Sequence, residues 1–334
     1  MPTACTLAPV TVPVYTHRPL AGKRRSPGLL LAALPWLALP TVLSPAAALA
    51  CACGCGVFDV GTASMFPARS GGTVFLEEDF VDQNRNWSGS SRAPAADNFD
   101  KQVRSFFTTL GGTYSFNADW SISVRLPYWQ RRFTTTDEAT GERVTFNHGA
   151  LGDARVTGTY TGFSADRSTG LVFGLKLPTG DYTYANFDRD TAIGTGTTDT
   201  LLGAWHQGNL SATHGLNWFV QGLWERALAS RAGYRPGDEL DTAVGIYHEG
   251  QGAANGLKLS PLLQLAYTWR AHDSGIESEP GNTGYTRILI APGLELRHGQ
   301  WRAYADVAIP VQQHISGNQL VAPALYKLIL SRAF

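Results

Sequence analysis

The chain carries little charge and no excess of either sign. Only 16% of its 334 residues are charged, and the 27 basic residues equal the 27 acidic ones. A soluble domain usually has about 25% charged residues, and a nucleic-acid-binding protein usually has a basic patch. The composition therefore argues against both of these classes.

Long apolar runs are also missing after the N-terminal region. No run beyond residue 50 approaches the length of about 20 apolar residues that a membrane-spanning helix needs. The chain instead holds 36 Gly, 9 Trp, 12 Tyr and 15 Phe. Few charges combined with many glycines and aromatic residues are typical of a β-barrel in a lipid bilayer.

Recognisable catalytic motifs are absent as well. The sequence has no Gly-x-Ser-x-Gly segment, so a nucleophilic serine is not indicated. It has no Cys-x-x-Cys-His segment, which excludes covalent haem attachment. We therefore expect no enzyme activity. The charge cluster Asp188-Arg189-Asp190 is expected to be a solvated loop tip, with binding of a divalent ion or of lipopolysaccharide as the alternative.

The first fifty residues have the composition of a secretory signal peptide. They contain no acidic residue, and a basic region at 18–25 precedes an apolar stretch at 28–42. Ala-Leu-Ala at 48–50 is a small-residue cleavage site. A membrane helix is the alternative, but two prolines interrupt the stretch and it is too short to span. The sequence predicts a signal at 1–50 and a mature chain that begins at Cys51.

Three cysteines lie at the start of this mature chain. Cys51, Cys53 and Cys55 belong to a Cys/Gly-rich segment at 51–71 that is too short to be a domain. Three cysteines cannot all pair within one chain, whereas closely spaced thiolates suit a soft ion such as Cu(I) or Zn. Acylation of Cys51 and a segment without specific chemistry remain open as alternatives.

The remaining chain alternates with a period of two residues. Trp120, Ile122, Val124, Leu126 and Tyr128 share one face of a predicted strand, and serines and Arg125 share the other. The same alternation places Leu263 and Ile309 on the outward face of later strands and Gln312 on the inward face. Residues 72–334 are therefore predicted to form an all-β, transmembrane, antiparallel up-and-down β-barrel. About twelve strands are expected, at 72–81, 101–116, 119–131, 150–162, 168–178, 197–207, 214–226, 238–249, 257–271, 284–298, 300–312 and 320–334.

The connections and the last residue support this interpretation. Connections after even-numbered strands are short and most of those after odd-numbered strands are long, as the periplasmic turns and external loops of outer-membrane barrels are. This pattern places both termini in the periplasm. The terminal Phe334 resembles the C-terminal signature of bacterial outer-membrane barrels, although Arg332 departs from it. We expect a monomer in the outer membrane, in contact with lipid, lipopolysaccharide and, through the last strand, the barrel-assembly machinery.

Three segments carry a resemblance to a known family. They are Leu-Gly-Asp at 151–153, Leu-Lys-Leu-Pro-Thr-Gly-Asp at 175–181 and Gly-Thr-Gly-Thr-Thr-Asp at 194–199. The region 150–210 resembles the outer-membrane family named after the MetA pathway of phenol degradation, a group of transporters. The resemblance implies an outer-membrane barrel and solute passage. Read from its residues alone, 176–181 is a rim turn, with Pro178 ending a strand and Asp181 closing an Asx turn.

Charged residues on the inward face of the predicted strands are candidates to line the lumen. Nine are basic and five are acidic, and this surplus would favour an anionic or polar solute unless the ions pair into a structural plug. The predicted function is a narrow channel or transporter for a small polar, anionic or aromatic solute. The alternative is a barrel-anchored metal-handling or interaction protein that uses the cysteine segment. The candidates are Arg125, Asp153, Arg155, Lys176, Glu225, Asp241, Lys258, Arg270, Arg287, Glu295, Arg297, Arg302, Asp306 and Lys327.

Overall fold

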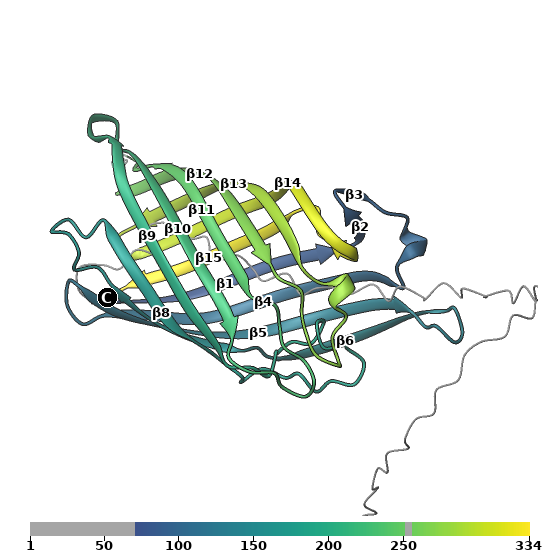
Figure 1. The fold of residues 1–334 in the computed structure, drawn as a ribbon. Coiled ribbons are helices and arrows are strands. Elements are labelled where there is room, and N and C mark those ends of the chain that lie inside the picture. Colours follow the sequence, from purple (N-terminus) through teal and green to yellow (C-terminus); the bar gives the residue numbers. More distant parts are fainter. Residues whose placement is uncertain (1–70, 251–255) are drawn as a thin grey trace, which may run out of the picture. The chain divides into compact units, whose positions relative to one another are not determined.

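The computed structural model of the chain describes residues 71–250 and 256–334. These residues form a closed antiparallel barrel of twelve strand positions (Figure 1), and two consecutive segments, β6 and β7, share the fourth position. The predicted signal peptide and the predicted metal ligands Cys51, Cys53 and Cys55 lie outside the described residues. The barrel strands are β1 (Gly71–Gln83), β4 (Asp100–Ser115), β5 (Trp120–Thr136), β6 (Arg143–Leu151), β7 (Ala154–Tyr160), β8 (Thr169–Leu177), β9 (Asp199–Ser211), β10 (Leu216–Ala227), β11 (Glu239–His248), β12 (Leu257–Arg270), β13 (Tyr285–His298), β14 (Trp301–Val321) and β15 (Leu325–Ala333).

The first and last strands close the sheet. β1 pairs with β15 from Thr73 opposite Ala333 to Val81 opposite Leu325, and its other edge pairs with β4. Each of the twelve strand positions thus has a hydrogen-bonded neighbour on both sides over part of its length, whereas the segment β6 pairs only with β5. Closure removes free sheet edges, which a bilayer would leave without hydrogen-bond partners. We call the end with the short connections the turn end and the opposite end the loop end.

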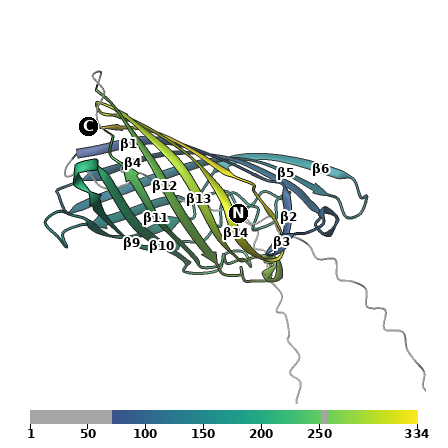
Figure 2. The ribbon, with the colours of Figure 1, turned by 90° about the horizontal axis from the view of Figure 1, so that it is seen from above.

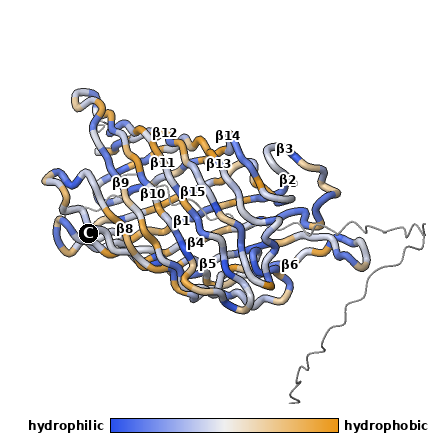
Figure 3. Tube along the Cα trace, in the orientation of Figure 1, coloured by the Kyte–Doolittle hydropathy of each residue, from blue (hydrophilic) through white to orange (hydrophobic). Residues whose placement is uncertain are grey.

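Side chains alternate between an exposed and a buried face, as predicted. Along β12, Leu259 and Leu263 are 48% and 43% exposed, whereas Gln264 is 2% exposed. Hydrophobic and hydrophilic residues alternate along most of the barrel strands (Figure 3). Val307 shares the outward face of β14 with Ile309. The apolar face of the barrel therefore points outward, and polar residues point to the interior.

Aromatic residues gather near both ends of the outward face. At the turn end the Trp120 ring lies 4.7 Å from the Tyr160 ring. Toward the loop end the Phe80 ring lies 4.7 Å from the Phe106 ring. Two such belts are typical of barrels that sit between two membrane–water interfaces.

The wall is irregular at its fourth strand position. The sequence predicted one strand at 150–162, but the chain breaks between β6 and β7 at Gly152 and Asp153. β5 pairs with both segments, while β8 pairs only with β7. The β5–β6 hairpin therefore continues beyond the neighbouring wall (Figure 2).

A β-bulge interrupts the pairing between β13 and β14 and reverses the predicted face of one residue. Leu289 pairs with Pro310 and Ile288 with Gln312, so Val311 is the additional residue. A one-residue shift exchanges the faces of all later side chains. Gln312 is therefore exposed and Gln313 is buried, and the predicted inward position of Gln312 is wrong. Beyond the bulge, β14 pairs with the short strand β2 (Arg85–Gly89), which forms a hairpin with β3 (Ser91–Arg92).

Helical structure among the described residues is limited to three short segments. These are η1 (Ala95–Asp97), η2 (Ala212–His214) and η3 (Pro280–Asn282). Within the described ranges no helix has the length and apolar character to cross a membrane.

Candidate functional site

Apolar side chains meet inside the barrel. Phe107 of β4, Phe219 of β10, Leu262 of β12 and Leu289 of β13 belong to one buried cluster, and Trp129 of β5 packs against it. The Phe107 and Trp129 rings are 4.5 Å apart and nearly perpendicular. Val81 and Leu325 also belong to the cluster, so both sides of the barrel closure contribute. We call this group the apolar layer. It fills part of the lumen with side chains.

A first ion network lies beside this layer. An oxygen of Glu77 on β1 lies 2.7 Å from Arg125 of β5 and 3.5 Å from Lys327 of β15. Lys327 also lies 3.6 Å from Asp79. Glu77 and Asp79 are 3% and 2% exposed. Two of the predicted lumen residues, Arg125 and Lys327, therefore share carboxylates from a strand whose inward face the sequence pattern did not define.

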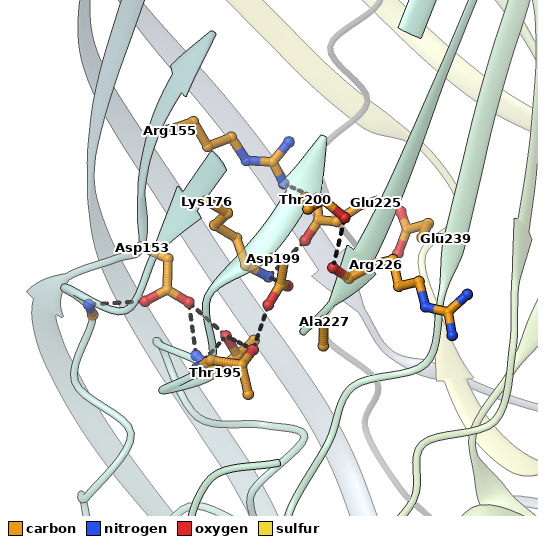
Figure 4. Close-up of polar contacts among 12 residues, drawn as sticks. Asp153, Arg155, Lys176, Thr195, Asp199, Thr200, Glu225, Arg226, Ala227 and Glu239 are labelled. Atoms are coloured by element: carbon orange, nitrogen blue, oxygen red, sulfur yellow. Dashed lines mark hydrogen bonds and ion pairs between the residues drawn. The ribbon is translucent and has the colours of Figure 1, made fainter. Parts of the chain in front are cut away.

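A second ion network joins four neighbouring strands (Figure 4). Lys176 of β8 contacts Asp199 of β9, and its Nζ lies 2.6 Å from an oxygen of Glu225 on β10. Arg155 of β7 donates a hydrogen bond of 2.8 Å to the other oxygen of Glu225. Of these residues, the sequence analysis identified Arg155, Lys176 and Glu225 and missed Asp199.

Other predicted lumen residues on the interior face have contacts outside these two salt-bridge groups. Arg270 contacts Asp273 at 2.8 Å and Glu239 at 3.9 Å. Asp306 accepts a 2.6 Å hydrogen bond from Tyr304. Asp241 accepts one of 2.7 Å from Thr268. Arg287 and Glu295 are also buried, at 2% and 6% exposure.

Three of the predicted basic residues are neighbours near the turn end. Lys258 pairs with Arg297, and Arg297 pairs with Arg302, so they lie side by side on β12, β13 and β14. Over the rest of the described interior, Glu77, Asp79, Asp199 and Glu239 offset the basic residues. These carboxylates reduce the surplus of basic residues that was counted from the sequence, and Lys258, Arg297 and Arg302 are the place where basic residues remain adjacent.

The three family-like sequence segments meet in space at the loop end. Asp153 accepts hydrogen bonds from the Gly180 amide at 2.9 Å and from the amide and the hydroxyl of Thr195, both at 2.8 Å. The Thr179 hydroxyl donates to the Gly152 carbonyl at 2.9 Å and accepts from the Ala154 amide at 2.8 Å. We call this group the Asp153 clasp.

Glycines make the clasp possible. A Cβ on Gly194 would lie 2.4 Å from the carbonyl carbon of Gly180, so larger residues would separate the two segments. Asp181 accepts a 2.9 Å bond from the Thr183 amide, which is the Asx turn predicted from the sequence. The predicted rim turn is therefore present, and it also fixes both ends of the loop at 178–198.

This loop lies against the inner wall at the loop end. Arg131 of β5 donates to the carbonyl oxygens of Thr191 and Ala192. Phe187, 8% exposed, packs with Phe133 and with Leu320 from the other side of the barrel closure. The loop therefore covers part of the barrel mouth.

A pocket of about 420 Å³ lies between this loop and the β12–β13 loop. Tyr182, Tyr184 and Phe187 line it together with residues 188–190 and 276–279. The cluster Asp188-Arg189-Asp190, expected to be a loop tip, thus forms part of a pocket wall. Among the described residues no group of His, Cys, Asp or Glu is arranged to hold a metal ion.

Comparisons with known proteins support the fold. Neither a protein-family model nor a curated protein matches the chain. The COG4313 outer membrane channel from Pseudomonas putida F1 is similar in structure, with a TM-score of 0.62 and 12% identity over 83% of this chain and 100% of that chain. The β domain of the Bordetella autotransporter BrkA has a TM-score of 0.47 and 12% identity over 79% and 100%. The CymD monoaromatic hydrocarbon channel has a TM-score of 0.41 and 10% identity over 83% and 94%.

The structural similarity to the COG4313 channel concerns the architecture of the chain. The comparison with the TM-score of 0.62 spans the whole of the other chain. The fold class predicted from the sequence is therefore confirmed: the chain has the fold of bacterial outer-membrane β-barrels.

Proposed function

We propose that this protein is a narrow channel or transporter of the bacterial outer membrane for a small solute with an aromatic or apolar body. The short connections of the turn end would face the periplasm, together with both termini, and the loop end would face the exterior. The observation that most directly supports this function is the apolar layer inside a closed barrel. The similarity to the COG4313 outer membrane channel supports passage of a solute.

The apolar layer decides which solutes cross most easily. A dissolved ion would lose water among the apolar side chains of Phe107, Trp129 and Phe219, whose rings do not replace its hydration. Apolar constrictions gate channels in this way. A neutral aromatic solute gains contacts with the same rings. The interior therefore favours an aromatic solute over an inorganic ion or an anion.

The ion networks have a structural role in this proposal. The first network pairs Arg125 and Lys327 with Glu77 and Asp79. The second pairs Arg155 and Lys176 with Glu225 and Asp199, so each network has two basic and two acidic groups. Charges that are paired within the wall attract a passing ion less than unpaired ones do. The adjacent basic residues Lys258, Arg297 and Arg302 would attract anions only at the periplasmic end.

Planar-bilayer recording tests the proposal. The wild-type barrel should show small conductance, and Phe219→Ala should increase it by removing a ring from the apolar layer. Val220→Ala is the matched control, because Val220 is 41% exposed on the outward face of the same strand. Uptake of labelled phenol by cells that produce each protein gives the second readout.

Two outcomes would contradict the proposal. Large wild-type conductance that Phe219→Ala leaves unchanged would show that the apolar layer does not restrict the lumen. No conductance in either protein, together with no phenol uptake above that of cells lacking the barrel, would show that the barrel passes no solute.

A further inference from the structure

The pocket at the loop end combines aromatic and acidic walls. Its aromatic side is formed by Tyr182, Tyr184 and Phe187. Its acidic side takes residues from both loops, namely Asp188, Asp190, Glu277 and Glu279. A volume of about 420 Å³ is within the range of small-molecule sites.

The cation in the pocket wall is already engaged by the protein. Arg189 donates hydrogen bonds to the carbonyl oxygens of Tyr182 at 3.1 Å and Thr195 at 2.9 Å. Its guanidinium also lies 4.7 Å from the Tyr182 ring centre and 4.9 Å from that of Tyr234. Arg189 therefore holds the loop together, and it offsets one of the four carboxylates at most.

The electrostatics of Glu279 show the resulting excess of negative charge. Burial and the nearby charges of Asp190 and Asp188 raise the pKa of Glu279 to about 7. Asn282 donates a weak hydrogen bond of 3.3 Å to this carboxylate. No cation among the causes of the shift compensates the repulsion, so a positively charged ligand would relieve it.

The same negative charges act on a second buried carboxyl, which lies outside the pocket lining. Asp100, the first residue of β4, is 5% exposed, and its Oδ2 has no hydrogen-bond partner. The charges that act on this carboxyl are those of Asp188, Asp190 and Glu279. The carboxyl also accepts a hydrogen bond from the Thr135 hydroxyl.

The pocket wall is held in place before any ligand arrives. The Asp153 clasp fixes both ends of the loop, and Arg131 and Phe187 fix its middle. A preformed wall reduces the entropy that a ligand must overcome on binding.

We propose that this pocket binds a small organic cation, a protonated amine or quaternary ammonium with an aromatic or apolar body. Carboxylates and aromatic faces together recognise such cations. A divalent metal ion fits less well, because the described residues contain no group of ligands arranged around one point. The site goes beyond passage through the barrel, since binding to the detergent-solubilised protein is measured without transport.

Isothermal titration of the full chain in detergent with phenylethylamine tests the proposal. The neutral analogue phenylethanol is the control ligand. We expect one site for the amine and at least tenfold weaker binding of the alcohol. The double variant Glu277→Gln/Glu279→Gln should weaken amine binding at least tenfold, whereas Glu249→Gln, a periplasmic-turn control, should leave it unchanged.

Four results would overturn the site. Equal affinity for phenylethanol and phenylethylamine would show that the pocket does not recognise the positive charge. Unchanged amine binding by the double variant, with the heat-dependent gel mobility of a folded barrel, would place the site elsewhere. Stoichiometric Ca²⁺ binding that displaces the amine would make it a metal site. Absence of amine binding at millimolar concentration would also refute the proposed site. A barrel that binds the amine but conducts no ions would refute only the proposed channel.

Discussion

Replacing Lys176 by methionine should destabilise the barrel, because Asp199 would lose its cation. The side chains of Lys176 and Asp199 are 8% and 1% exposed. Glu225 would keep Arg155 at 2.8 Å, so the loss falls mainly on Asp199. Removing one partner of a buried ion pair costs about 3–5 kcal/mol. We expect the lower end of this range, about 3 kcal/mol.

A second substitution separates lost charge pairing from lost packing. In the double variant Lys176→Met/Asp199→Asn, the remaining Arg155–Glu225 pair is neutral and no carboxylate of this network lacks a cation. Replacing both partners of a buried pair is often nearly neutral. We therefore expect the double variant to regain most of the stability that Lys176→Met loses.

Urea unfolding of the refolded barrel, followed by tryptophan fluorescence, measures these differences. Lys258→Met is the matched control, because Lys258 is partly exposed near the turn end. It should change the free energy of unfolding by less than about 1 kcal/mol. If Lys176→Met is as stable as Lys258→Met, the interior is wet enough to screen the network. If the double variant loses more than the single one, packing and not charge is responsible.

Three further predictions concern the wall, the clasp and the acidic pocket. Leu263→Arg, in the middle of the outward face of β12, should lower the free energy of unfolding, measured with urea in lipid, by about 2–4 kcal/mol. Leu257→Arg, at the end of the same row, should lower it by only about 0–1 kcal/mol. Equal losses would contradict the membrane placement. Asp153→Ala removes the acceptor of three hydrogen bonds and should speed tryptic cleavage at Arg189, and an unchanged rate would show that the clasp does not hold the loop. Because the folded pKa of Glu279 is raised to about 7, lowering the pH from 8 to 6 protonates it, so amine binding should weaken; binding that strengthens at pH 6 would refute this.

The groups that face Glu279 determine how that last result is interpreted. The amine itself stays charged at both pH values, because its pKa lies near 10. A raised carboxyl pKa also means that the loop is more stable when Glu279 is protonated, and this stability is lost as the pH rises through about 7. A melting temperature measured at each pH separates loop stability from ligand binding. The facing charged groups are Asp188, Arg189 and Asp190 of one loop, Glu277 of its own loop, Glu138 of the β5–β6 turn and Asp100 of β4.

The sequence defined the barrel well because its signal repeats along every strand. Alternation with a period of two residues predicted the outward rows, and Leu263 and Ile309 lie where it placed them. It failed where one residue breaks the period. The additional residue Val311 moved Gln312 outward, and a bulge has no compositional signal of its own.

The first strand shows a different limit of pattern reading. Glu77 and Asp79 face the interior, but Glu78 between them faces outward and accepts a 3.0 Å hydrogen bond from Thr108. Three consecutive acidic residues offer no alternation from which to choose a face. Only the register with β4 and β15 distinguishes them, and that register is a property of the closed sheet.

The clasp and the pocket depend on contacts between distant segments. Gly152, Gly180 and Gly194 each read as ordinary turn residues in the sequence, and nothing in their spacing shows that they meet. The pocket joins residues near 188 to residues near 279, which lie in loops separated by four strands. Polar side chains in loops have no periodicity, so their position follows only from the folded barrel.

Charged residues inside this barrel and at its mouth should have different consequences. Within the wall, Lys176 and Glu77 are neutralised by neighbours, so their replacement should alter stability more than the choice of solute. At the mouth, Glu279 lies among charges of its own sign, so its replacement should alter ligand choice more than stability. Under the two proposals, a solute that enters from the loop end would meet the acidic pocket first and the apolar layer second, so its charge would matter before its shape. If substitutions at Lys176 changed ligand preference while those at Glu279 did not, the assignment of stability to the wall and of ligand choice to the mouth would be wrong.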